Sequence, residues 1–162
     1  MPMGPVRAFL NGQEQRECVE MTIAAILRTK SSDVVTLPPS ADVTGAVALL
    51  AEKRIGAIPV VQGDRVVGIF SERDVIHCLA TRGAAALELA VSEVMTAPPR
   101  TVSPDEPVLG ALSLMTRRRV RHLPVVEGER LVGFVSIGDL VKYRIDRIEQ
   151  EAEAMRSYIQ SA

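Results

Sequence analysis

The chain has 162 residues, 47% of them hydrophobic and 24% charged, which suits one domain or two small lobes that share a core. The net charge of −1 provides no overall attraction to nucleic acid or membranes, and no apolar run approaches the roughly 20 residues of a membrane span. Cys18 and Cys78 form no CxxC motif and the opening residues lack signal-peptide features, so we expect a cytoplasmic protein without disulfides.

Residues 1–21 show no clear periodicity and are expected to form an N-terminal arm. Beyond the arm, Asp42 is the expected cap of a helix and Gly63 supplies the positive φ of a hairpin turn. Ser71 opens a further helix, which Gly83 ends. The predicted elements of this first half are a helix at 22–27, a strand at 34–37, a helix from 43, strands at 57–61 and 65–70, and a helix from 71.

The second half repeats the first at a distance of 65 residues. Roughly two in five positions of 36–74 are identical to their counterparts in 101–139, which no single short motif would explain. The second half is therefore predicted to contain a strand at 100–102, a helix that starts at 104–107, strands at 122–126 and 130–135, and a helix from 136. The recurring pairs include Pro59 and Pro124, Gly63 and Gly128, Gly68 and Gly133, Ser71 and Ser136, and Asp74 and Asp139.

The last helix is predicted to run from about 137 to 159, well beyond its counterpart in the first half. Its apolar residues are spaced 4, 3, 4, 3 and 4 apart, which is a heptad seam. Two interpretations stay open: a self-association or docking helix, and packing against the N-terminal arm. The residues of the seam are Val141, Ile145, Ile148, Ala152, Met155 and Ile159.

This doubled β-α-β-β-α order, with proline in the middle strand, glycine in the hairpin and Ser-x-x-Asp at the last helix, resembles the CBS domain. The domain is named for cystathionine β-synthase, and a tandem pair is a Bateman module, here similar to stand-alone bacterial CBS-pair proteins. The resemblance implies an α/β (α+β) fold of two pseudo-symmetric repeats packed sheet to sheet, plus a long C-terminal helix. The expected parts are an arm at 1–21, repeats at 22–82 and 95–144, a connector at 83–94, and a helical extension at 145–162.

The resemblance also implies ligand sites in the cleft between the repeats, because family members commonly bind AMP, ADP or ATP, and sometimes NAD(H) or S-adenosylmethionine. A carboxylate can accept both hydroxyls of a ribose, and a helix N-terminus or an arginine suits phosphate. The predicted ligand-binding residues are Thr36, Ala57, Ile58, Pro59, Ser71, Arg73, Asp74, Thr101, Arg121, His122, Leu123, Pro124, Ser136 and Asp139.

The two sites are not equivalent in sequence. Arg121 and His122 stand where the first repeat has Gly56 and Ala57, so we expect the second-repeat site to prefer the more phosphorylated end of a nucleotide. A structural interpretation of the Ser-x-x-Asp motifs stays open, since the same pattern forms capping boxes on helices that bind nothing.

The leading hypothesis is a regulatory sensor of adenine nucleotides, expected as a homodimer that acts on an unknown regulated protein. Two histidines, no metal-ligand cluster and no nucleophile beside a base argue against an enzyme, a metal site or a catalytic cofactor. One alternative is nucleic-acid binding through the basic run 117–121, although stacking aromatics are scarce. Another is a structural dimerisation module with vestigial sites.

Overall fold

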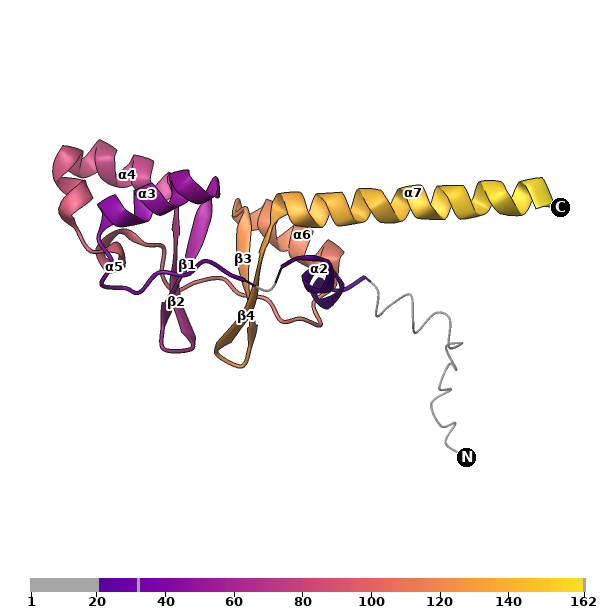
Figure 1. Cartoon of the computed structure of the whole chain (residues 1–162), viewed down its shortest axis with the longest axis horizontal. Coiled ribbons are helices and arrows are strands. Elements are labelled where there is room, and N and C mark those ends of the chain that lie inside the picture. The colour runs from indigo at the N-terminus through magenta and orange to yellow at the C-terminus, as the bar shows by residue number, and fades with distance from the viewer. Residues whose placement is uncertain (1–20, 32, 162) are drawn as a thin grey trace, which may run out of the picture.

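The computed structural model describes residues 21–31 and 33–161, so the predicted arm lies outside the described residues except for Met21. Two lobes lie side by side, and one long helix projects from the second (Figure 1). The strands are β1 (Ala57–Gln62), β2 (Arg65–Ser71), β3 (His122–Glu127) and β4 (Arg130–Ser136). The helices are α2 (Ile23–Thr29), α3 (Val43–Lys53), α4 (Glu72–Arg82), the 3-10 helix η1 (Gly83–Glu88), α5 (Val91–Val94), α6 (Val108–Arg118) and α7 (Ile137–Ser161).

Each lobe contains one antiparallel hairpin, β1 with β2 and β3 with β4. The hairpin turns place Gly63 and Gly128 at φ 64°, a left-handed conformation that glycine adopts without steric cost, as the sequence predicts. The mixed α/β class is therefore confirmed. The hairpins also meet edge to edge at the pair Arg65 and Arg130, so the four strands form one sheet of order β1-β2-β4-β3.

The prediction of short strands at 34–37 and 100–102 is wrong, because neither segment forms a strand. Each is reduced to one parallel bridge, Leu37 to Val60 and Val102 to Val125. Leu37 donates its backbone N–H to the carbonyl of Pro59 and accepts from the N–H of Val61. Because proline has no N–H, the adjacent strand offers no further donor at that position, and the ladder does not extend. In the second repeat Pro124 likewise lacks the N–H that would extend the pairing of Val102.

The helix ends largely follow the predicted signals. The Asp42 side chain accepts from the N–H of Gly45 at the start of α3, and Gly83 follows the last residue of α4. The helix expected from 104–107 begins at Val108, because Pro107 precedes it as its N-cap. The first helix spans 23–29 rather than 22–27.

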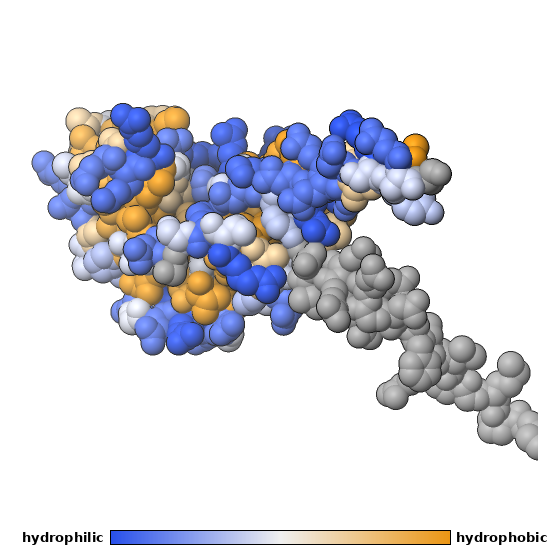
Figure 2. Space-filling view, turned by 45° about the vertical axis from the view of Figure 1, so that its right-hand side comes forward, coloured by the Kyte–Doolittle hydropathy of each residue, from blue (hydrophilic) through white to orange (hydrophobic). Residues whose placement is uncertain are grey.

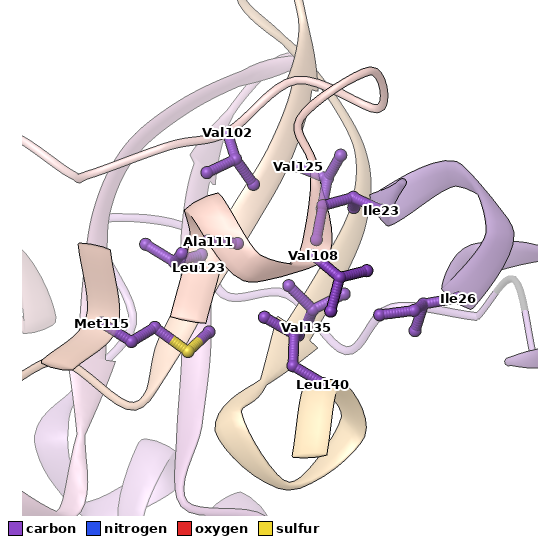
Figure 3. Close-up of a cluster of buried hydrophobic side chains, with 10 residues drawn as sticks. All are labelled: Ile23, Ile26, Val102, Val108, Ala111, Met115, Leu123, Val125, Val135 and Leu140. Atoms are coloured by element: carbon purple, nitrogen blue, oxygen red, sulfur yellow. The ribbon is translucent and has the colours of Figure 1, made fainter. Parts of the chain in front are cut away.

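Helix α2 packs on the core of the second lobe, and α5, which lies within the connector predicted at 83–94, packs on the core of the first. Ile23 and Ile26 of α2 pack with residues of α6, β3, β4 and α7, such as Leu123 and Leu140, although α2 opens the first repeat (Figure 3). Conversely, Val91 of α5 packs in the core of the first lobe, which also contains Phe70. This exchange brings residues from both repeats together at the cleft between the lobes.

Helix α7 runs through 144 and 145 without a break, which confirms the predicted long helix. Leu140 is its single fully buried residue, and the helix extends past the lobe into open space (Figure 1). Within the described residues, no helix is long and apolar enough to cross a membrane.

Candidate ligand-binding site

A cavity of about 450 Å³ lies between the two repeats. One wall comes from the first repeat, with Val34 and Val35 before the first hairpin and residues 54–57 at the entry to β1. The opposite wall comes from the second repeat, with His122 at the start of β3 and Phe134 on β4. The walls combine apolar residues with polar and charged ones, which include Lys30, Asp33 and Asp139. Such a cavity suits an organic ligand with a flat apolar part and a hydroxyl or charged end.

Asp139 is, with Asp33, one of the two acidic residues that line the cavity. It lies in the first turn of α7, where its Oδ2 accepts from the Ser136 N–H at 2.8 Å while the Ser136 Oγ accepts from the Asp139 N–H at 3.1 Å. This capping box holds the carboxylate at the helix N-terminus. The Lys30 Nζ donates to the same Oδ2 at 2.7 Å and to the carbonyl of Phe134 at 2.9 Å.

The charge state of Asp139 follows from these contacts. Burial by itself would raise the pKa of the carboxyl, but the hydrogen bonds from Lys30 and Ser136 and the charge of Lys30 outweigh burial and leave the pKa of Asp139 below its ordinary value. The carboxylate is therefore ionised at neutral pH and acts only as an acceptor.

His122 borders the cavity above Phe134. The two rings are stacked with centroids 5.6 Å apart and planes 12° from parallel. Burial lowers the pKa of His122 from its ordinary 6.5, against the opposing charge of Asp139. The imidazole is therefore neutral at pH 7 and offers one donor and one acceptor.

Asp74 is the counterpart of Asp139, but its surroundings differ. Its Oδ2 accepts from the N–H and the Oγ of Ser71, both at 2.7 Å, and its Oδ1 accepts from the Thr96 Oγ1 at 2.8 Å. Thr96 is held in place because its backbone pairs with Ile69 of β2. Both oxygens of Asp74 therefore already have partners within the protein, and Asp74 does not line the cavity.

The predicted site residues divide into three groups. Those that line the cavity are Ala57, His122, Ser136 and Asp139. Those buried in strands behind or beside it are Ile58, Pro59, Leu123 and Pro124. Those elsewhere are Thr36, Ser71, Arg73, Asp74, Thr101 and Arg121.

Arg73 and Arg121, which the sequence predicts as ligand-binding residues, do not line the cavity. Arg121 is exposed and does not line the cavity of Asp139, so the pair Arg121 and His122 is split. Arg73 donates from Nη1 to the carbonyl of Arg119 at 2.9 Å. Arg119 is the left-handed C-cap of α6, so Arg73 of the first repeat satisfies a helix end of the second.

Further residues that the sequence did not predict for the site also line the cavity, among them Lys30, Asp33, Arg54 and Phe134. Arg54 carried a signal, since it recurs as Arg119 and both residues are left-handed helix caps. Lys30 carried none, because it lies before the aligned part of the repeat and position 95 is a methionine.

Two solved structures that resemble this chain are complexes with adenosine compounds. One is CBSX2 in complex with AMP, with a TM-score of 0.67 and 24% identity over 77% of this chain and 96% of that chain. The other is the CBS domain pair of protein MJ0100 in complex with 5-methylthioadenosine and S-adenosyl-L-methionine, with a TM-score of 0.68 and 24% identity over 78% and 97% of the two chains. At this identity the likeness establishes the fold.

The family model for the CBS domain matches residues 23–81 and 91–146. The mitochondrial CBS domain-containing protein CBSX3 of Arabidopsis thaliana is 33% identical over 86% of this chain and 72% of its own length. A protein with CBS domains from Burkholderia ambifaria MC40-6 is 41% identical, with a TM-score of 0.72 over 77% and 94% of the chains. ATU1752 from Agrobacterium tumefaciens is 35% identical, with a TM-score of 0.73 over 85% and 99%. The chain therefore belongs to the CBS domain family, as a tandem pair of CBS domains that forms a Bateman module.

Proposed function

We propose that this protein is a regulatory module that binds an adenosine-containing ligand in the cavity beside Asp139, with no catalysis of its own. The observation that carries the proposal is the Asp139 carboxylate, which lines a cavity that also has apolar walls from both repeats. All of its hydrogen bonds from the described residues reach Oδ2, so Oδ1 can accept a ligand hydroxyl. The complexes of CBSX2 with AMP and of the MJ0100 pair with S-adenosyl-L-methionine support this ligand class.

The chemistry of the cavity fits a nucleoside. A ribose presents two neighbouring hydroxyls, and an ionised carboxylate can accept from both. The apolar walls, including Val35 and Phe134, suit the base. Lys30 holds Oδ2 in the structure, and a ribose that takes this oxygen leaves the ammonium to pair with the phosphate of AMP, ADP or ATP.

Regulation follows from the two walls of the cavity. A ligand that contacts both repeats binds best in one relative arrangement of the lobes and shifts their population toward it. The coupling would pass through the interface where the Arg73 side chain of one repeat holds the end of α6 of the other.

Thermal unfolding in the presence of candidate ligands tests the ligand class. AMP, ADP, ATP, NAD, NADH and S-adenosylmethionine are compared with an RNA oligomer of matched charge. A ligand that binds only the folded state at 100 times its Kd stabilises by about 2.7 kcal/mol, a readily measured shift. If no adenosine compound raises the midpoint, the proposal is rejected, and a response to RNA alone would favour the basic run 117–121.

Two matched variants test the cavity itself. Asp139→Asn keeps an oxygen acceptor for the helix cap but removes the charge, and we expect at least about a tenfold loss of affinity in calorimetry, since a hydrogen bond to a charged group contributes roughly 1.5–3 kcal/mol. Asp74→Asn is the control, because the Asp74 oxygens already have partners in Ser71 and Thr96. Equal loss in both variants would contradict the assignment to the Asp139 side.

A further inference from the structure

We propose that two copies of this chain associate through a parallel, in-register coiled coil formed by the projecting part of α7. This inference is independent of the ligand proposal. Ile145, Ile148, Met155 and Ile159 are 48–68% exposed, although isoleucine and methionine side chains are normally buried. Figure 2 shows the helix standing clear of the body, with mostly hydrophilic side chains on the visible side and a hydrophobic residue near its end.

The apolar seam does not face the protein's own core. Ile137, Leu140 and Tyr143 of α7 pack on the core of the second lobe, and none of them belongs to the seam. In a heptad assignment, Ile145, Ala152 and Ile159 take position a while Ile148 and Met155 take position d. The seam continues to Ile159, far beyond the last core contact at Tyr143.

The charges that flank the seam determine the orientation. In a parallel dimer, position g of one helix lies beside position e of the next heptad on the other helix. This brings Arg144 beside Glu149 of the second copy and Glu151 beside Arg156 of the second copy, and symmetry repeats both pairs. All four pairs join opposite charges.

An antiparallel dimer with the same overlap would be unfavourable. It places Glu149 beside Glu149 and Glu151 beside Glu151, and it brings Lys142 beside Arg156. These contacts join like charges and raise the free energy of that arrangement. Among the described residues, Arg156 forms an exposed pair with Glu153 at 3.4 Å, which contributes little. The flanking charges therefore select a second copy in parallel orientation as the occupant of the seam.

Charge reversal in the full chain tests the proposal by light scattering, where the dimer has twice the 17.5 kDa chain mass. Glu151→Arg and Arg156→Glu each create two like-charge pairs, and we expect each to raise the dimer dissociation constant at least about tenfold. Mixing the two variants restores opposite charges at both pairs, so the mixture should recover the dimer. Glu153→Arg, at an outward position on the same helix, is the control and should keep the wild-type mass.

Several outcomes would overturn the proposal. A monomeric wild type up to high protein concentration excludes the dimer, and so does a variant mixture that stays monomeric. A dimer that resists both charge reversals uses another surface. Circular dichroism of each variant checks that α7 remains helical, and Ile148→Asp provides a second break of the seam. If a chain that lacks residues 1–20 becomes dimeric while the full chain is monomeric, the occupant is the chain's own N-terminal segment.

Discussion

The ammonium of Lys30 lies 2.7 Å from Oδ2 of Asp139, although the two residues are 109 positions apart. The ion pair joins the segment that leads into the first repeat to the first turn of the last helix of the second. It is therefore a contact between the two halves of the chain within the lining of the cavity. The pair is partly solvated, with side-chain exposures of 40% for Lys30 and 29% for Asp139, so its contribution to stability is modest.

Replacing Lys30 by methionine should make the stability less dependent on acid pH. The pKa of Asp139 is lowered in the folded state, so its contribution is present above the ordinary value of 3.8 and is lost as pH falls through the lowered pKa. We expect Lys30→Met to cost up to about 1 kcal/mol in urea unfolding at pH 7 and progressively less below pH 4. Arg28→Met, an exposed position nearby, is the control. A cost that does not change with pH would contradict the assigned pair.

His122 should make the protein sensitive to mild acid. Burial lowers the pKa of His122 below 6.5, so the unfolded chain binds a proton more readily, and stability falls as pH drops below 6.5. His122→Gln should reduce the loss of thermal midpoint between pH 7 and pH 5. The exposed His77, replaced in the same way, should leave that loss unchanged. Identical pH profiles for the wild type and His122→Gln would refute this role.

Removing the Arg73 guanidinium should weaken the contact between the repeats without weakening ligand binding. Arg73 donates to the Arg119 carbonyl, and a hydrogen bond of this kind contributes roughly 0.5–1.5 kcal/mol. We expect Arg73→Ala to lose about 1 kcal/mol in urea unfolding, while Arg100→Ala, another exposed arginine, loses much less. A large drop in nucleotide affinity for Arg73→Ala would instead return this residue to the phosphate site that the sequence suggested.

Gly68→Ala should destabilise the protein more than Gly133→Ala. A Cβ at Gly133 would lie 2.6 Å from the Cδ2 of Leu27, a side-chain end that can move. At Gly68 the new atom would lie 2.5 Å from the Met95 sulfur and 3.0 Å from the backbone oxygen of Thr96, which pairing with β2 holds in place. Overpacking of this kind costs typically 1–3 kcal/mol, and chemical denaturation measures it.

A double-mutant cycle checks the cause at Gly133. Combining Gly133→Ala with Leu27→Ala removes the clash, so the two changes together should cost less than the sum of the separate costs. Additive costs would mean that the Leu27 side chain is not what crowds a Cβ at Gly133. At Gly68, truncation of Met95 should relieve only part of the cost, because the backbone oxygen of Thr96 stays 3.0 Å from the new Cβ.

The sequence alone determined the elements whose causes are local. The hairpins follow from glycine at the turns, and the helix ends follow from Asp42, Ser71 and Gly83, because each signal acts within a few residues. The 65-residue repeat determined the tandem architecture for the same reason, since each copy contains its own signals. The short strands at 34–37 and 100–102 failed because their pairing depends on a distant proline.

The candidate site was decided by the tertiary structure. Ser71-x-x-Asp74 and Ser136-x-x-Asp139 are the same motif, and both carboxylates receive the same local cap. What separates them is the residue that each meets from another part of the chain, Thr96 for Asp74 and Lys30 for Asp139. These neighbours follow α5 and α2, whose packing on the cores of the two lobes is long-range and is encoded by no local pattern.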